Sequence, residues 1–220
     1  MIPRASVRGA VLAGGDSTRF AGGGKALADL NGRPMLDRVL TPVGAATDGS
    51  PVLAVASDVE GERLAGAVDT PVETVVDVPE PAGPVAGLLA AAAATDHEWL
   101  FVCGCDMPLV AAAGVDALRR AADSDRFREA ADSDPTDGLD AVVPTVEGFP
   151  QPLHALYRRE AVLAVSESVP ETGGPMALLD VLEAVRHVPA EALDAPLAAA
   201  VTNVNTRADF EGVADRLRDR

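Results

Sequence analysis

The stretch "LAGGDSTRFAGGGKALADLNGRP" (12–34) concentrates residues that can bind phosphate groups. It places Gly14 and Gly15, then Arg19 and Lys25, on one glycine-rich segment that follows a short apolar run. The backbone N–H groups of such a loop can hold phosphate oxygens. A guanidinium binds the same oxygens through paired hydrogen bonds, and an ammonium adds a point charge. The stretch therefore predicts a phosphate-binding loop with Arg19 and Lys25 as its cations.

This loop matches neither of the two common nucleotide-binding patterns. A P-loop needs Gly, four residues and then Gly-Lys-Ser/Thr, but the first of these positions is Arg19 and the last is Ala26. A dinucleotide fingerprint needs G-x-G-x-x-G, and after Gly22 and Gly24 its third position is Leu27. The missing fingerprint makes an NAD-dependent dehydrogenase improbable. We therefore expect a different way of holding phosphates.

Two aspartates lie where strands are expected to end. Asp77 follows "VETVV", and Asp106 stands in "CDMP". Ligands of open parallel sheets bind beyond the carboxyl ends of the strands. A carboxylate at that edge suits Mg²⁺, which prefers carboxylate and phosphate oxygens, so Asp106 is the expected metal ligand. The alternative for both residues is that of an ordinary turn-forming aspartate.

The composition is acidic, with a formal net charge of -16 and Lys25 as the only lysine. This charge argues against nucleic acid or an anionic membrane as the main partner. An acidic, lysine-poor and alanine-rich chain is typical of a high-salt cytoplasm, where charge repulsion is screened. The N-terminal residues lack a secretory pattern and the longest apolar run is too short to span a bilayer, so we expect a cytoplasmic protein.

Cys103 and Cys105 are the only cysteines, and they lie two positions apart. This spacing is too short for an ordinary disulfide framework, and two ligands are too few for a zinc site. We expect reduced thiols that serve packing. His154, in the apolar stretch "QPLHALY", has two open interpretations: a packed core residue or a residue that reaches a substrate pocket.

Apolar runs alternate with helical patterns along the chain, which predicts a parallel sheet with helices on both faces. No internal repeat or linker divides it, and the polar segment 123–138 is interpreted as a solvated excursion. Strands are expected at 7–15, 51–57, 71–78, 98–108, 139–145, 151–158 and 200–206. Helices are expected after Pro34, at 58–68, from about Pro84, at 111–122, near 159–168 and 175–185, and at 207–220.

The stretch "LAGGDSTRFAGGGKALADLNGRPML" resembles the signature of the molybdenum cofactor guanylyltransferases, the MobA family, whose pattern is roughly LAGG-x-S-x-R-M-G-x-D-K followed by a G-x-P turn. "GPVAGL" (83–88), "CDMP" (105–108) and "NVNT" (203–206) agree in the same order. Each motif alone is weak, but four in order are specific. The resemblance covers nearly the whole chain, from about residue 7 to 210. It departs from the family at Phe20 and Gly24, where the family has Met and an acidic residue.

The resemblance implies a three-layer Rossmann-like nucleotidyltransferase fold in one domain over residues 1–220, with a GTP-binding half over about 1–108 and an acceptor-binding half over about 139–220. It implies that Asp106 binds Mg²⁺ and that Asn203 and Asn205 lie near the pterin substrate and the metal. The family's asparagine after the second strand is absent, and Ser57 is its candidate substitute. By the same resemblance, the GTP contacts are Leu12, Ala13, Gly14, Gly15, Lys25, Asp77 and Asp106.

The reaction implied is transfer of GMP from GTP to the terminal phosphate of molybdopterin, with release of pyrophosphate. Arg19 and Lys25 would offset charge on the leaving group, and Mg²⁺ on Asp106 would bridge phosphates. The resemblance also implies transient contacts with molybdopterin-delivering proteins and apo-molybdoenzymes. Alternatives are a cobinamide-phosphate guanylyltransferase, a molybdopterin cytidylyltransferase and a non-catalytic nucleotide or pterin carrier. Gly14 in "LAGG" favours guanine, because the cytidylyl enzymes usually begin LAAG.

Overall fold

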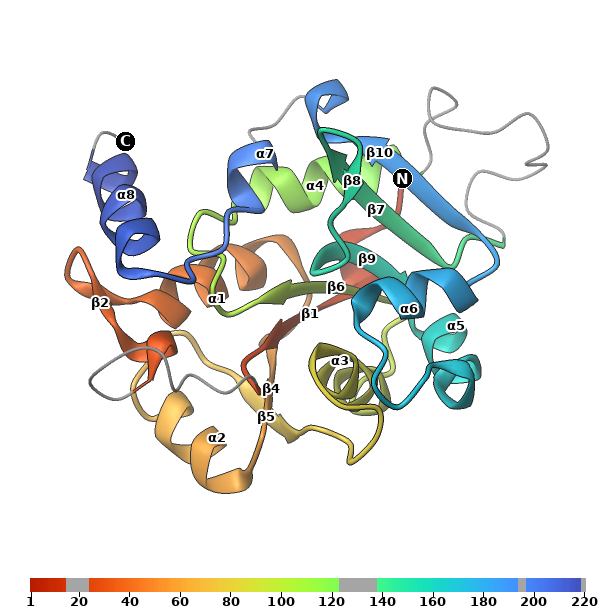
Figure 1. Cartoon of the computed structure of the whole chain (residues 1–220), viewed down its shortest axis with the longest axis horizontal. Coiled ribbons are helices and arrows are strands. Elements are labelled where there is room, and N and C mark those ends of the chain that lie inside the picture. Colours follow the sequence, from red (N-terminus) through yellow and green to blue (C-terminus); the bar gives the residue numbers. More distant parts are fainter. Residues whose placement is uncertain (15–23, 123–137, 194–196, 219–220) are drawn as a thin grey trace.

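A mixed sheet forms the centre of the molecule, and helices cover both of its faces (Figure 1). The computed structural model describes residues 1–14, 24–122, 138–193 and 197–218. Over these residues the strand order is β10-β7-β9-β6-β1-β4-β5, with β8 beside β7. The strands are β1 (Val7–Leu12), β4 (Val52–Val55), β5 (Glu73–Val76), β6 (Trp99–Gly104), β7 (Ala141–Val146), β8 (Phe149–Pro150), β9 (His154–Arg158) and β10 (Val185–Pro189).

Most of the strands of this sheet point the same way. β1 pairs in parallel with β4 and β6, β4 with β5, and β10 with β7. β9 lies antiparallel to both β6 and β7, so β7 keeps the direction of β6. The carboxyl ends of six strands therefore share one edge, where ligands of such sheets bind. This confirms the expected α/β class with a mostly parallel central sheet.

The helices divide between the two faces according to their apolar residues. α1, α2, α4 and α7 pack on one face against Val11, Phe101 and Cys103. α3, α5 and α6 pack on the other against Ala10 and Val102. Successive residues of a strand thus serve opposite cores. The helices are α1 (Met35–Ala46), α2 (Asp58–Ala65), α3 (Pro84–Ala93), α4 (Ala112–Ala121), α5 (Arg159–Ala164), α6 (Pro175–Val181), α7 (Leu197–Ala200) and α8 (Arg207–Arg218).

Two expectations about the C-terminal part are wrong. Residues 200–206, expected as a strand, join no sheet: α7 ends at Ala200, and an extended segment leads to α8. Val204 alone is buried there, and its N–H donates to the Asp106 carbonyl at 2.9 Å. Residues 185–189 form the edge strand β10, where the sequence predicts only the end of a helix. The excursion predicted at 123–138 lies outside the described residues, except for Gly138.

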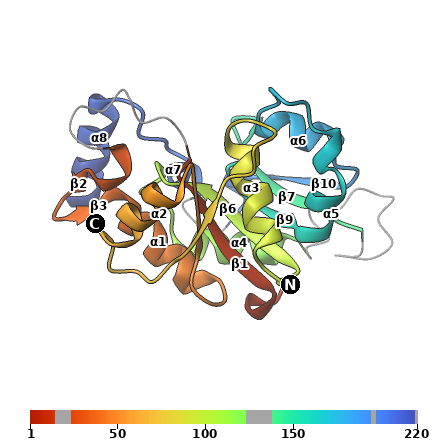
Figure 2. The same cartoon turned by 90° about the horizontal axis from the view of Figure 1, so that it is seen from below.

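A two-stranded hairpin, β2 (Asp29–Leu30) and β3 (Arg33–Pro34), connects the glycine-rich segment to α1. The C-terminal helix α8 lies beside it in both views (Figures 1 and 2). A third apolar cluster, formed by Leu30, Met35, Leu109, Val204 and Val213, joins the two elements. The Asn31 side-chain amide also donates to the Ala214 carbonyl of α8 at 2.8 Å. The hairpin thus contacts α8 through both apolar and polar groups.

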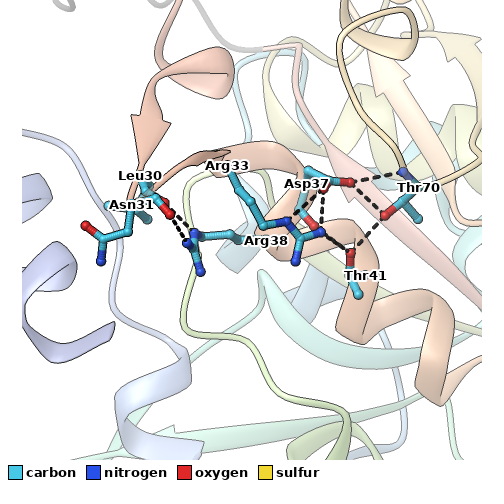
Figure 3. Close-up of polar contacts among 7 residues, drawn as sticks. All are labelled: Leu30, Asn31, Arg33, Asp37, Arg38, Thr41 and Thr70. Atoms are coloured by element: carbon cyan, nitrogen blue, oxygen red, sulfur yellow. Dashed lines mark hydrogen bonds and ion pairs between the residues drawn. The ribbon is translucent and has the colours of Figure 1, made fainter. Parts of the chain in front are cut away.

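Polar contacts from α1 hold the turn and the base of this hairpin (Figure 3). Arg38 donates Nε to the Leu30 carbonyl at 2.6 Å and Nη2 to the Asn31 carbonyl at 2.9 Å. Arg33 forms an ion pair with the buried Asp37 one helical turn later, and its Nη2 reaches Thr41 Oγ1 at 2.9 Å. The path between residue 25 and α1 is therefore fixed by charged side chains that bind backbone oxygens and each other.

Asp37 extends these contacts to the loop before β5. Its Oδ1 accepts the Thr70 N–H at 3.0 Å and the Thr70 hydroxyl at 2.7 Å. Burial alone would raise the pKa of Asp37, but the hydrogen bonds from Arg33 and Thr70 outweigh it and lower the pKa. Asp37 thus contributes stability that is present above its unfolded pKa and is lost as the pH falls through the lowered folded value.

Over the described residues, no helix has the length and apolarity needed to cross a membrane.

We expect Asp37→Asn to reduce the free energy of unfolding by about 2 kcal/mol at pH 7, because charge-assisted hydrogen bonds from Arg33 and Thr70 are weakened. Urea denaturation measures this change. The matched control is Asp180→Asn on the exposed side of α6, which should change stability by less than about 0.5 kcal/mol. Equal losses for the two variants would contradict this account of the cluster.

Candidate active site

One ammonium group joins three distant parts of the chain at the carboxyl edge of the sheet. Lys25 Nζ donates to Asp106 Oδ2 and to Asn205 Oδ1, each at 2.9 Å. These residues come from the 3₁₀ turn η2 (Lys25–Leu27), from the segment after β6 and from the segment before α8. The side chains of Lys25 and Asp106 are 14% and 25% exposed, so water screens their attraction less than at an open surface. The structure thus brings together three of the residues that the sequence predicts for the site.

Backbone contacts place Asp106. The Cys105 N–H donates to the Leu12 carbonyl at 3.0 Å, which extends the pairing of β1 and β6 beyond the strand ends. The Asp106 carbonyl accepts from Val204, so the chain before α8 is anchored at the same point. A Cβ on Gly104 would lie 2.5 Å from Asp106 Oδ1. Glycine at the end of β6 therefore leaves room for the carboxylate to lie over the strand.

Gly24 precedes Lys25 with a φ of 96°, a conformation that favours glycine. A Cβ at this position would lie 2.9 Å from Arg63 Nη2 of α2. Arg63 in turn donates Nε and Nη2 to the Glu60 carboxylate at 2.9 and 2.7 Å. Where the family pattern has an acidic side chain, a guanidinium from the neighbouring helix abuts this glycine. The backbone angle therefore favours glycine at residue 24, and a side chain there would have to displace the flexible end of Arg63.

Asp77 lies between two glycines where β5 ends. Its N–H donates to the Val55 carbonyl at 2.8 Å. A Cβ on Gly14 would lie 1.8 Å from Asp77 Oδ2, and one on Gly87 would lie 3.0 Å from Oδ1. Oδ1 is buried and has no hydrogen-bond partner in the described part of the chain, and burial raises the pKa of this carboxyl. Because an unpaired buried acceptor is costly, this oxygen is a candidate to bind a donor from a ligand.

Other predicted residues of the glycine-rich segment are described only in part. Leu12 is the last residue of β1, and the Ala13 N–H donates to the Ala54 carbonyl at 2.8 Å, which directs the chain toward Gly14. Gly15 and Arg19 lie outside the described residues. The prediction that Arg19 binds phosphate therefore stays a prediction.

Asn203 and Asn205 lie on either side of the buried Val204. Both are exposed, and Asn205 binds Lys25. Ser57, the candidate substitute for the family's asparagine, instead caps α2, because its Oγ accepts the Glu60 N–H at 3.3 Å. Sequence reasoning overlooked Asp209, although Thr206-x-x-Asp209 has the spacing of a capping box at the start of a helix.

The thiols and His154 lie in or beside the core. Cys103 is buried, and burial raises its pKa; burial and the nearby Asp106 carboxylate raise the pKa of the half-buried Cys105 to about 12. Both are therefore protonated thiols at neutral pH, as expected for packing residues. His154 is fully buried, its ring meets Phe101 edge-on with centroids 5.1 Å apart, and neither ring nitrogen has a partner within the described ranges. Its surroundings fit a core residue.

The donor set at this edge fits Mg²⁺ bound together with phosphate groups. Mg²⁺ in such sites uses one or two carboxylates and takes further oxygens from phosphate and water. Asp106 offers a partly exposed carboxylate of this kind. In the part of the chain that the structure describes, no cluster of three or more His, Cys, Asp or Glu side chains could hold a metal ion by itself. A metal on Asp106 would take phosphate oxygens and water as further ligands.

Comparison with known proteins shows the family of the chain. The MobA-like NTP transferase domain family matches residues 9–190. A probable molybdenum cofactor guanylyltransferase of Haloferax mediterranei is 31% identical, over 94% of this chain and 93% of that protein. A molybdenum cofactor guanylyltransferase of Desulfosudis oleivorans is 27% identical over the same shares of the two chains.

Solved structures show the same fold. Molybdopterin-guanine dinucleotide biosynthesis protein A of Archaeoglobus fulgidus superposes with a TM-score of 0.72 at 22% identity, covering 97% of this chain and all of that one. A CMP:2-keto-3-deoxy-manno-octonic acid synthetase superposes with a TM-score of 0.67 at 15% identity, covering 97% of this chain and 98% of that one.

The fold, the family model and the relatives together identify a nucleotidyltransferase enzyme. The chain belongs to the MobA-like NTP transferase domain family, and its relatives act in molybdenum cofactor biosynthesis.

His154 is buried, and its ring nitrogens have no hydrogen-bond partner among the described residues. We therefore expect His154 to make the free energy of unfolding depend on pH. Desolvation lowers the pKa of His154 from 6.5 to about 4, so between these pH values the unfolded chain binds the extra proton. The free energy of unfolding should therefore fall as the pH falls from about 6.5 to 4, by up to about 3 kcal/mol from this residue. Urea denaturation of the protein and of His154→Leu over this range measures the effect. The variant should lose less stability, and parallel pH curves would contradict the assignment.

Proposed function

We propose that this enzyme transfers GMP from GTP to the terminal phosphate of molybdopterin, forming molybdopterin guanine dinucleotide. The observation that carries the proposal is the contact of Lys25 with both Asp106 and Asn205 at the carboxyl edge of the sheet. It unites a cation from the glycine-rich segment with a carboxylate suited to Mg²⁺ and an amide from the C-terminal segment. The names of the two relatives support guanylyl transfer.

The reaction is a substitution at phosphorus. An oxygen of the terminal phosphate of molybdopterin forms a bond with the α-phosphorus of GTP, and the bond from that phosphorus to the bridging oxygen of the β-phosphate breaks. The electron pair leaves with pyrophosphate. Such reactions depend on positioning and charge stabilisation more than on covalent chemistry of the protein. A site in which both thiols stay protonated and His154 is buried agrees with that requirement.

Lys25 and Asp106 have different electrostatic roles in this proposal. The ammonium of Lys25, together with Arg19, offsets negative charge on the leaving pyrophosphate. Asp106 would hold Mg²⁺, which would supply positive charge next to the phosphate groups. Lys25 contacts Oδ2 of Asp106 in this structure, so the ammonium lies directly beside the carboxylate that would hold the metal.

Asp77 supplies the preference for guanine. The Watson–Crick edge of guanine presents two neighbouring donors, N1–H and the 2-amino group, whereas cytosine presents one amino group. The unpaired Oδ1 of Asp77 can accept such a donor, and Gly14 and Gly87 leave room for the carboxylate. In this proposal Leu12 to Gly15 contact GTP as well, residues 1–108 bind GTP, and residues 139–220, with Asn203 and Asn205, bind the acceptor.

The deciding experiment measures pyrophosphate release from GTP with Mg²⁺, in the presence and absence of molybdopterin. We expect release that needs both. CTP as donor and cobinamide phosphate as acceptor are the matched alternatives, because each belongs to a related nucleotidyltransferase. Incorporation from CTP alone, or transfer only to cobinamide phosphate, would overturn the proposal.

Replacing Lys25 tests the core of the site. Lys25→Gln should lower kcat/KM for GTP by about 10²–10³-fold, because a preorganised charge facing the leaving group is lost. Arg207→Gln is the control, since Arg207 is 90% exposed and pairs only with Glu211 in the described contacts. A Lys25→Gln enzyme within a few-fold of the parent activity would exclude this role.

Replacing Asp77 tests base selection. Asp77→Asn keeps the shape of the side chain but replaces one oxygen with a donor, so the preference for GTP over ITP, which lacks the 2-amino group, should fall by about tenfold. Because burial raises the pKa of Asp77, acidic pH should also raise the KM for GTP in the parent enzyme and not in the variant. Steady-state kinetics with both nucleotides checks this, and an unchanged GTP/ITP ratio would contradict it.

A further inference from the structure

The first turn of α8 holds the backbone of Asn205. Asp209 Oδ2 accepts the N–H groups of Asn205 and Thr206 at 2.9 and 2.7 Å. Thr206 Oγ1 accepts the Asp209 N–H at 3.1 Å in return. This reciprocal arrangement is a capping box with Asp where Glu or Gln is usual. It fixes the turn from which the Asn205 side chain reaches Lys25.

The helix that carries Asp209 is itself anchored. Val213 of α8 packs in the apolar cluster with Leu30 and Val204, and the Ala214 carbonyl accepts from Asn31 of the hairpin. On the other side of the turn, the Val204 N–H binds the Asp106 carbonyl. Asn205 is thus held between two fixed points, and Asp209 is the side chain that closes the turn between them.

The electrostatic surroundings of Asp209 agree with its place beside the turn that carries Asn205. The N–H groups of Asn205 and Thr206, and then the Thr206 hydroxyl and the charge of Lys25, lower the pKa of Asp209. Asp209 is therefore ionised at neutral pH and lies within electrostatic reach of the site lysine. Its hydrogen bonds are nevertheless made to backbone groups of the turn and not to Lys25 itself.

We propose that Asp209 is a positioning residue for nucleotidyl transfer. By holding the backbone of Asn205, it sets the place of the amide oxygen that keeps Lys25 against Asp106. The inference rests on the proposed function for the role of Lys25 in the reaction. It also makes a separate statement about the free protein, namely that the surroundings of the Lys25 ammonium depend on a residue of α8.

The kinetic test compares Asp209→Ala with Asp209→Asn. The alanine variant should lower kcat by about tenfold with KM for GTP changed less than about twofold, because a misplaced Lys25 weakens charge stabilisation while the phosphate loop still binds. Asn keeps an oxygen acceptor for the two N–H groups and should restore at least half of the activity. Asp215→Ala, in the same helix and paired with Arg218 at the surface, is the control and should match the parent enzyme.

A double-mutant cycle separates positioning from a general effect of the helix cap. If Asp209 acts through Asn205, Asp209→Ala should cost little further activity in an Asn205→Ala background. Losses that multiply would show that the two residues act independently and would overturn the proposal. If Asp209→Ala does not fold, Asp209→Ser replaces it, since its hydroxyl does not reach as far as Oδ2.

The second readout needs no activity. Lys25 is the only lysine, so reductive ¹³C-methylation labels its ammonium and the N-terminal amine alone, and NMR reports the two separately. Asp209→Ala should shift the Lys25 signal and leave the N-terminal signal unchanged, whereas Asp215→Ala should shift neither. An unshifted Lys25 signal would overturn the proposal even if transfer activity is present. A shifted signal without GMP transfer would instead refute the proposed function alone.

Discussion

The ammonium of Lys25 is the contact on which the site depends. Its two acceptors lie 81 and 180 positions away in the chain, at Asp106 and Asn205. In a chain of net charge -16, the long-range electrostatic field opposes the approach of a nucleoside triphosphate. Salt screens that field over roughly 10 Å, but a short, half-buried ion pair is screened less. Phosphate attraction therefore has to come from cations placed at the carboxyl edge itself.

The surrounding structure keeps this one group in place from several directions. Gly24 and η2 fix the backbone from which the Lys25 side chain extends. The pairing of β1 with β6 continues to Cys105 and places Asp106 at the same edge of the sheet. The hairpin that follows is held by Arg38 and by the Arg33–Asp37 pair, and it supports α8 through Asn31. The two halves of the site are thus parts of one connected framework around the edge of the sheet.

Much of this arrangement could be predicted from the sequence, because the inner strands are continuous apolar runs. β1, β4 and β6 are buried on both faces, and their ends place Gly14 and Asp106 at the ligand edge. Local pattern fails at the periphery. β10 alternates buried and exposed residues at the edge of the sheet, and its short "VRHVP" does not stand out from the helix expected before it. Residues 203–206 alternate like a strand, yet only Val204 packs, because the backbone there binds Asp106 and the start of α8. Contacts such as Arg63 beside Gly24 depend on tertiary structure and leave no local signal.

The separation of Lys25 from Asn205 also sets the order in which the site can form during biosynthesis. On the ribosome, the glycine-rich segment and then β6 leave the exit tunnel long before residue 205 has been made. Until Asn205 emerges, Lys25 has only its Asp106 acceptor, and α8 is not present to hold the hairpin. A nascent chain therefore cannot complete the contacts of Lys25 before residue 205 has been made, and any product that stops before residue 205 lacks the second acceptor of Lys25.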